Sequence, residues 1–440
     1  MATISENLQT IKNSVSAIKQ AISDKGGDVS GDISTWANAI GGLSGGGSSS
    51  GGTSFNDVNF YDCDGTLLHS YSASEIASMS QLPELPTREG LTCQGWNYSL
   101  AEIKSMASDY GKCDVGATYI TDDGKTRLYI RIAAKGRMTV PLYFEQTSAN
   151  GVTIDWGDGS ATQTLSGTIS KNITHTYSNI GDYCITLKVT SGTLELGHNS
   201  DSYCVLGSIG NDGRIYCNML QKVEIGSGVT SIGRYAFQYC HSLTSVVIPR
   251  GVTSIGDYAF YFCYSLAPTI IPSGVTSIGQ WAFHQCRSLT SVVIPSSVTS
   301  IYDYAFYGCS FDSVVIPSSV TRIGSQAFYQ CSSLASVVIP SSVTSIGTST
   351  FSNCVSLASV VIPSSVTSIG SNAFNNCYGM AYYDFSNHKS VPTLSNTNAF
   401  NNIPSDCKIV VPDSLYNTWI AATNWSTYSS NIVKASTFTF

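Results

Sequence analysis

The chain is long, weakly charged and acidic. It has 440 residues, of which 42% are hydrophobic and 12% are charged, and its formal net charge is -7. The length predicts several domains, and the acidic balance without a basic patch argues against nucleic acid as a partner.

Residues 1–43 are predicted to form a helical module for oligomerisation or attachment. Apolar side chains alternate at spacings of four and three residues and so form a heptad seam: Ile4, Leu8, Ile11, Val15, Ile18 and Ile22. Isoleucine at the d positions favours trimers or tetramers over dimers, so we expect a homo-oligomer, with a trimer favoured. An intramolecular helical hairpin is the alternative. Residues 44–54 form a flexible Gly/Ser linker.

The N-terminal residues carry no basic segment followed by an apolar one, so we expect no signal peptide. No run of residues is apolar enough for a membrane span, and we expect no membrane insertion.

Residues 55–126 are typical of a small α+β domain. A hairpin is expected to turn at Asp64-Gly65, and a short helix is expected from Ser99 to Ser108. The pattern Phe60-Tyr-Asp, Pro86-Thr-Arg-Glu-Gly and Gly95-Trp96 is similar to the small β-grasp repeats of listerial-type surface proteins.

Residues 127–193 alternate in hydrophobicity as the strands of a β-sandwich do. The segment Val152-Thr-Ile-Asp-Trp-Gly-Asp-Gly-Ser, followed by His175-Thr-Tyr, resembles a PKD domain, which implies an Ig-type sandwich.

Asp155 and Asp158 could be paired carboxylates or calcium ligands. Their Trp-Gly-Asp-Gly context is more typical of a strand end and a tight turn in which the Asp side chains bond to local backbone. We expect His175 to be a hydrogen-bonded structural residue. No nucleophile motif or phosphate-binding loop is present, so we expect no catalytic residue, no cofactor, no metal site and no enzyme activity.

From residue 194 to 380 one sequence motif repeats about every 23 residues, as from Cys240 to Cys263. This period predicts a solenoid. Its constant Leu, Val, Ile, Ala, Phe and Cys positions should form the core, and its constant proline should end a short strand. One turn is a residue short, and Phe311 is expected to fill its Leu position. Residues 381–440 are predicted to be a degenerate repeat and a C-terminal cap, with a helix within Asp413–Asn424.

Alternation within each short strand leaves one row of β-branched residues pointing outward. The row is Val247, Ile270, Val293, Val315, Val338 and Val361. It is either a ladder that stabilises the sheet or an exposed apolar strip for a partner.

Eight of the 14 cysteines stand at one position of the repeat, from Cys217 to Cys377. Each occupies the place of a small buried apolar residue, so we expect free thiols and a protein made in a reducing cytoplasm.

The pattern Cys-x-x-Leu-x-x-Val-x-Ile-Pro-x-x-Val-x-x-Ile-Gly-x-x-Ala-Phe-x-x-Cys resembles the leucine-rich repeat of the BspA or Treponema type. Members of that family are commonly surface adhesins, so the resemblance implies recognition rather than catalysis. The segments from Asn7 to Val15 and from Ile33 to Ile40 resemble the N-terminal attachment segments of tail-fibre proteins in gut bacteriophages.

Aromatic residues gather at the variable positions around the constant Ala-Phe-x-x-Cys of the early turns. Equal offsets line up as columns along a solenoid, and Tyr and Trp dominate binding hot spots, so these positions are the predicted receptor-binding surface. The set is Tyr235, Tyr239, Tyr258, Tyr261, Tyr264, Trp281, His284, Arg287, Tyr304, Tyr307 and Tyr329. Ordinary solvated loop composition is the alternative.

The sequence as a whole favours a mainly β, multidomain bacteriophage tail-fibre or virion receptor-binding protein. In this hypothesis residues 1–43 dock to other virion proteins in the host cytoplasm, and the repeats bind a glycan or protein on the host cell surface. The first alternative is a BspA-like adhesin on a bacterial surface. The second is a structural virion decoration protein without specific binding.

Overall fold

The computed structural model describes residues 57–110, 113–146, 151–166, 169–190, 192–197, 203–208 and 214–439. The chain divides into two compact units, Met1–Asp57 and Val58–Phe440. The heptad seam, its hairpin alternative and the Gly/Ser linker therefore lie outside the described residues. The second unit is mainly β, and none of its described helices is long and apolar enough to cross a membrane.

Residues 57–121, here called the small domain, form a mixed four-stranded sheet with two helices. The strand order is β2-β1-β4-β3, with β1 parallel and β3 antiparallel to β4. The elements are β1 (Asp57–Tyr61), β2 (Leu67–Ser72), α3 (Ala73–Ser78), β3 (Leu91–Trp96), α4 (Leu100–Tyr110) and β4 (Cys113–Thr121). Capping boxes begin both helices, Ser72 with Glu75 and Ser99 with Glu102. The predicted hairpin and helix are both present.

The next residues form two facing sheets of antiparallel strands, here called the sandwich. Strand β10 pairs with β5 and β7, while β6 pairs with β9 and β11. The elements are β5 (Thr126–Ile132), η1 (Lys135–Arg137), β6 (Thr139–Gln146), β7 (Val152–Asp155), β8 (Gln163–Leu165), β9 (Ile169–Thr176), β10 (Gly181–Val189) and β11 (Leu194–Leu196).

The turn after β7 has the structural role that its sequence predicts. Asp155 accepts a hydrogen bond from the Gly157 amide, and Asp158 accepts one from the Ser160 amide. His175 Nε2 lies 2.7 Å from the Asp158 carboxylate, and its ring stacks on Trp156. Hydrogen bonds from Ser160 and His175 lower the pKa of Asp158 to about 2.

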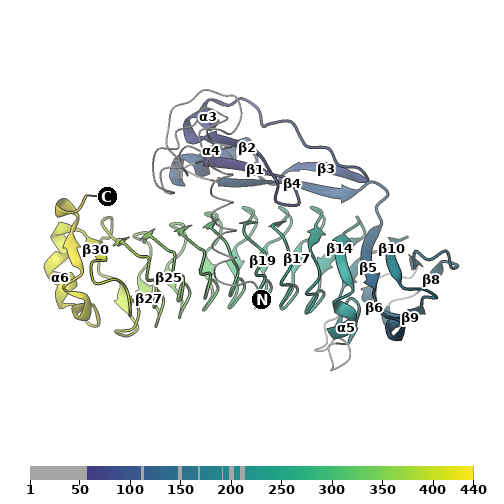
Figure 1. Cartoon of the computed structure of the whole chain (residues 1–440). Helices are drawn as coiled ribbons and strands as arrows, with labels where there is room; N and C mark the ends of the chain where they lie inside the picture. The colour runs from purple at the N-terminus through teal and green to yellow at the C-terminus, as the bar shows by residue number, and fades with distance from the viewer. Residues whose placement is uncertain are drawn as a thin grey trace, which may run out of the picture. The chain divides into compact units, whose positions relative to one another are not determined.

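Each turn of the solenoid contributes one short strand to each of two parallel runs (Figure 1). The first run comprises β14 (Leu220–Glu224), β16 (Ser245–Val247), β18 (Thr269–Ile270), β20 (Val292–Val293), β22 (Ser313–Val315), β24 (Ser336–Val338), β26 (Ser359–Val361) and β28 (Tyr382–Asp384). The second comprises β15 (Val229–Ile232), β17 (Ser254–Ile255), β19 (Ser277–Ile278), β21 (Ser300–Ile301), β23 (Arg322–Ile323), β25 (Ser345–Ile346), β27 (Ser368–Ile369) and β29 (Thr393–Leu394). The short elements β12 (Tyr203–Cys204), β13 (Gly207–Ser208) and α5 (Arg214–Cys217) precede the first full turn.

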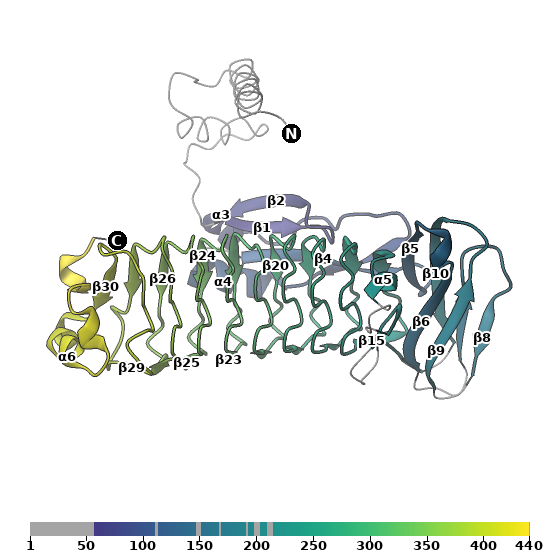
Figure 2. The same ribbon diagram turned by 60° about the horizontal axis from the view of Figure 1, so that its bottom comes forward.

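The sandwich is continuous with the solenoid. Strand β14 pairs antiparallel with β5 on one side and parallel with β16 on the other. Strand β11 joins β6 to β15 in the same manner. One apolar cluster extends from Leu128 to Ile432. Figure 2 shows the sandwich at one end of the solenoid, with β5, β6 and β10 next to the first turns. The sandwich therefore caps the first turn, whose apolar end and strand edges would otherwise be open.

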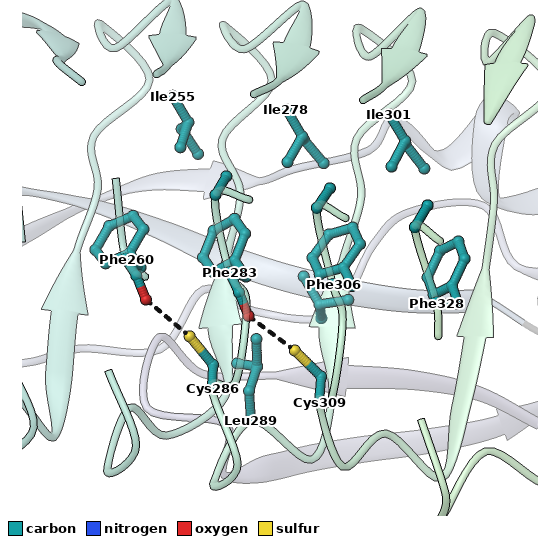
Figure 3. Packing of buried hydrophobic residues seen from close by; sticks show 14 of the residues in the cluster. Ile255, Phe260, Ile278, Phe283, Cys286, Leu289, Ile301, Phe306, Cys309 and Phe328 are labelled. Atoms are coloured by element: carbon teal, nitrogen blue, oxygen red, sulfur yellow. Dashed lines mark hydrogen bonds between the residues drawn. The ribbon is translucent and has the colours of Figure 1, made fainter. Parts of the chain in front are cut away.

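The core is built of repeated rows of identical side chains (Figure 3). The constant phenylalanines stack at centroid distances of 5.0–5.5 Å from Phe237 to Phe400. Phe311 is fully buried at the Leu position of the short turn, as expected, and packs edge-on against Phe306.

Each constant cysteine from Cys263 to Cys377 donates a hydrogen bond from its thiol to a phenylalanine carbonyl of the preceding turn. In Cys286, for example, the sulfur lies 3.2 Å from the Phe260 oxygen. These seven thiols, counting Cys240, are buried and free, but the eighth cysteine, Cys217, forms a disulfide with Cys204. The prediction of free thiols throughout the row is therefore wrong at the first turn, where Cys204 comes from outside the repeat.

The C-terminal end is closed by aromatic side chains. Trp419 and Trp425 are fully buried, and Trp425 packs on Phe400, the last ring of the phenylalanine row. The elements are β30 (Lys408–Val411), η2 (Asp413–Leu415), α6 (Tyr416–Ala421), η3 (Trp425–Tyr428), β31 (Ile432–Lys434) and η4 (Ala435–Thr437). The predicted closing helix is present but shorter than Asp413–Asn424.

The small domain covers half of the outward β-branched row. Val247, Ile270 and Val293 are at most 7% exposed and share an apolar cluster with the small domain, whereas Val361 is 55% exposed. Strand β4 packs against β16, β18 and β20. In its first three turns the outward row is therefore a binding surface, and the small domain of the same chain binds to it.

Polar contacts fix this docking at residues that depart from the repeat. Arg250 stands where later turns have serine, and its guanidinium donates to the Trp96 carbonyl and to Thr118. The Tyr98 hydroxyl donates to the Ile294 carbonyl. Gly116 allows close approach, because a Cβ there would lie 2.4 Å from an Ile270 carbon.

We expect the cysteines from Cys240 to Cys377 to resist alkylation in the folded protein. Burial raises their pKa values, to about 12 for Cys331 and Cys377, and the neutral thiol is a poor nucleophile. Mass spectrometry after treatment with N-ethylmaleimide should find label only at the half-buried Cys93 and Cys184. In denaturant all seven should react. Native labelling within the row would contradict the packing described above.

Gly116→Ala should loosen the small domain from the solenoid. The added methyl group would overlap Ile270, so we expect a loss of about 1–3 kcal/mol in unfolding free energy and increased binding of an apolar dye. Gly251→Ala is the matched control, because a Cβ at Gly251 meets nothing within 4 Å. Equal unfolding free energies and equal dye binding in the two variants would show that Gly116 and Ile270 are not in close contact.

Candidate functional site

In each turn from that of Phe237 to that of Phe374, two positions beside the constant phenylalanine adopt a left-handed backbone. Tyr235, Tyr258, Trp281 and Tyr304 have φ of 57–62°, as do Gln326, Ser349 and Asn372 at 53–57° in later turns. This conformation directs each amide toward the next turn, as when the Trp281 amide donates to the Asp303 carbonyl. The backbone therefore requires the left-handed conformation in each of these turns, whichever residue is present.

The residue type at these positions changes along the solenoid. Bulky residues pay of order 1–3 kcal/mol for a left-handed backbone, whereas asparagine and glycine adopt it readily. Later turns use Asn353, Asn372, Asn376 and Asn402 there. The early turns use Tyr or Trp at the first position throughout and Tyr or Phe at the second in the first two turns, followed there by Gln285 and Gly308. The phenylalanine row continues through the turns of Phe351, Phe374 and Phe400, whose left-handed positions carry no aromatic residue. The early aromatic residues are therefore not required by the scaffold.

The structure brings the predicted receptor-binding residues together in stacked columns. In the first column, Tyr235, Tyr258, Trp281 and Tyr304 stack at 5.0, 6.0 and 3.8 Å between ring centroids. In the second, Tyr261, His284, Tyr307 and Tyr329 stack at 4.8, 4.5 and 4.8 Å. A shorter column holds His241 and Tyr264, with Arg287 over the Tyr264 ring.

Contacts between columns make one continuous surface, here called the aromatic face. The ring centroids of Trp281 and His284 are 4.7 Å apart. The Phe262 ring contacts the rings of Tyr239, Tyr261 and Tyr264. Phe262 was missed by the sequence prediction, although it occupies the variable position before a constant cysteine. Arg234, also missed, lies over the Tyr235 ring, and Gln326 ends the first column with a hydrogen bond to the Tyr304 hydroxyl.

Stacking leaves the edges of these rings, rather than their faces, for a partner. Tyr235 and His284 are only 9% and 6% exposed, and burial lowers the pKa of His284 to about 4, so its imidazole is neutral at neutral pH. The surface offers hydroxyl and ring-nitrogen edges beside the charged Arg287.

A shallow hollow adjoins the columns at their C-terminal end. It has a volume of about 400 Å³ and is lined by Gln285, Arg287, Gly308, Cys309, Ser310, Gln330, Ser332, Asn353 and Val355. Its lining is mostly polar side chains, which extends the aromatic face with hydrogen-bonding groups.

Among the described residues, one cluster of three possible metal ligands is close enough to hold a single ion, and all three are cysteines. Its members are Cys204, Cys217 and Cys240, whose sulfur atoms lie within 4.8 Å of one another. The disulfide between the first two leaves a single thiol, so this group does not present a thiolate site.

Three solved structures illustrate the similarity of this chain to known proteins. A leucine-rich repeat protein from Bacteroides ovatus is 30% identical over 44% of this chain and 55% of its own length, with a TM-score of 0.40. A leucine-rich repeat protein from T. pallidum is 31% identical over 36% of this chain and 83% of its own, with a TM-score of 0.33. A leucine-rich cell surface protein from Faecalibacterium prausnitzii is 25% identical over 56% and 90%, with a TM-score of 0.30. No curated protein matches the chain.

The family model described as the BspA type leucine rich repeat region matches residues 207–335 and 299–418, in six copies. The match leaves the sandwich strands β5 to β10 outside it, so the PKD resemblance of that segment rests on its residues alone. The matched residues contain the aromatic face and the rows of Phe, Cys and Leu that form the solenoid core. This region of the chain is therefore a BspA-type leucine-rich-repeat solenoid.

Proposed function

We propose that this protein is a BspA-like surface-recognition protein that binds a protein partner through the aromatic face. The observation that carries the proposal is the placement of tyrosine, tryptophan and phenylalanine at left-handed positions of the early turns alone. The scaffold requires the left-handed backbone but not a bulky residue on it, and strain of this kind is commonly kept for function. No described feature favours an enzyme, and the proposal needs no cofactor.

A protein partner fits the aromatic face better than a sugar does. Rings held edge-outward by stacking lose little side-chain entropy when a partner binds, and tyrosine hydroxyls can donate and accept hydrogen bonds. Arg234 and Arg287 lie over Tyr235 and Tyr264 at the borders of the face and add positive charge there. An acidic or polar protein surface would complement them.

The bacterial cell surface is the location that we favour. The Cys204–Cys217 disulfide is typical of proteins in an oxidising environment. The sequence predicts a protein made in a reducing cytoplasm, where such a bond is rare. The tail-fibre hypothesis depends on residues 1–43, which lie outside the described residues, and it has no support from the comparisons. Docking to virion proteins and specific host attachment stay predictions.

Replacing two central aromatic residues by asparagine should abolish the part of cell binding that depends on cell-surface protein. Tyr258→Asn with Trp281→Asn keeps a residue that tolerates the left-handed backbone, so we expect a folded protein with only a modest stability loss from lost stacking, about 0.5–1.5 kcal/mol per pair. Fluorescently labelled full-length protein would be measured by flow cytometry on bacterial and on epithelial cells, before and after protease treatment of the cells.

Ser349→Asn is the matched control, because Ser349 occupies the same left-handed position in a turn outside the aromatic face. The control should bind as the unchanged protein does, and protease treatment of the cells should remove the difference in binding between the unchanged protein and the double variant. Full binding by the double asparagine variant would overturn the proposed site, and a difference that survives protease would overturn the proposed partner class.

The heptad seam predicts that the full chain forms trimers. Removing residues 1–54 should leave a monomer, because the seam is then absent and the compact unit Val58–Phe440 remains. Light scattering coupled to size-exclusion chromatography would measure both masses. A monomeric full chain would contradict an oligomerising role for Ile4, Leu8, Ile11, Val15, Ile18 and Ile22.

A further inference from the structure

Two neighbouring turns break the repeat on the second run of strands. After the constant isoleucine the other turns have glycine, at Gly233, Gly256, Gly279, Gly324, Gly347 and Gly370, but the turn of β21 has Tyr302. Before that isoleucine the other turns have serine, at Ser231, Ser254, Ser277, Ser300, Ser345 and Ser368, but the turn of β23 has Arg322. These two departures belong to successive turns, whose strands β21 and β23 pair with each other.

Each glycine of this row packs closely against the backbone of the preceding turn, so a side chain at that position would destabilise the stack unless the backbone shifts. A Cβ on Gly279 would lie 2.6 Å from the Gly256 carbonyl carbon, and one on Gly370 would lie 2.7 Å from that of Gly347. Tyr302 nevertheless occupies this row and is 38% exposed. The guanidinium of Arg322 lies over its ring, 5.1 Å from the centroid, and 3.7 Å from an oxygen of Asp303. The solenoid needs neither residue, since every other turn dispenses with both.

Tyr302 and Arg322 line a hollow of about 570 Å³, within the range of about 300–1,000 Å³ typical of small-ligand sites. Glycines on the neighbouring turns leave the space open, and polar groups surround it. The other lining residues are Ser254, Ile255, Gly256, Asp257, Ser277, Gly279, Gln280 and Asp303.

The two carboxylates of this hollow are held in place by the backbone. Asp257 Oδ1 accepts the Gln280 amide at 2.8 Å, and Asp303 Oδ1 accepts the Ser325 amide at 3.0 Å. Within the described part of the chain, Oδ2 of each aspartate makes no hydrogen bond. Each Oδ2 is therefore a fixed acceptor that a ligand hydroxyl could use.

We propose that this hollow binds a neutral hexopyranose unit of a glycan. Tyr302 offers the ring face that Arg322 does not cover as an apolar surface for the C–H face of the sugar. Asp257 and Asp303 accept hydrogen bonds from its hydroxyl groups, and Arg322 donates to its oxygen atoms. Two carboxylates against one guanidinium leave the lining negative, which disfavours sialic and uronic acids. Tyr302 is not part of the stacked columns, so this site is separate from the aromatic face.

Substitutions that restore the repeat provide the test. Tyr302→Gly and Arg322→Ser each install the residue that other turns carry, so both variants should fold and retain the thermal stability of the unchanged chain. The full-length protein would be applied to an array of gluco-, galacto- and manno-oligosaccharides and of sialylated and uronic-acid glycans. We expect binding to a neutral hexose glycan, with a loss of about tenfold or more in each variant.

The Tyr258→Asn, Trp281→Asn variant should keep the glycan signal, which separates this site from the proposed protein-binding function. Ser368→Ala, at the serine row outside the hollow, is a further control and should bind normally. The proposal would be overturned by the absence of neutral-glycan binding, by binding confined to acidic glycans, or by undiminished binding in both repeat-restoring variants.

Discussion

The hydrogen bonds that join one turn to the next dictate the rest of this structure. A parallel stack of turns must pair its backbone amides with the carbonyls of the following turn, because an unpaired buried amide is costly. On the two stranded sides, extended backbone does this directly. On the third side, the amides of Tyr258 and Trp281 reach the next turn because these residues adopt a left-handed conformation.

This requirement separates backbone geometry from side-chain choice. Each turn from that of Phe237 to that of Phe374 has a left-handed residue at the same two places, yet nothing in the stack dictates which side chain it carries. The left-handed positions carry mainly aromatic residues in early turns and mostly small or amide residues in later turns. Comparing the two groups of turns therefore separates side chains that the stack requires from those that it does not. The same logic applies to Tyr302 and Arg322, which stand where other turns have glycine and serine.

Much of the solenoid was predictable, because each core position recurs and identical side chains must meet their copies above and below. The phenylalanine and cysteine rows, the Phe311 replacement and the turn at Asp155 and Asp158 follow from residue type and spacing. Three features could not be predicted. Cys204 pairs with Cys217 from outside the repeat, the sandwich continues the solenoid sheets, and β4 covers Val247, Ile270 and Val293. Each depends on contacts between segments far apart in sequence, which a periodic pattern does not encode.

The docking of the small domain has a consequence for how the solenoid could change in length. Arg250, Ile270 and Val293 lie in successive turns that the small domain contacts together, so adding or deleting a turn among them would shift every later contact by one repeat. Among the described strands, β24, β26 and β28 pair only with the strands of neighbouring turns, and Val361 in their outward row is 55% exposed. Duplication or loss of whole repeats is therefore tolerable in the C-terminal half alone, where it would move the cap without disturbing the docked domain or the aromatic face.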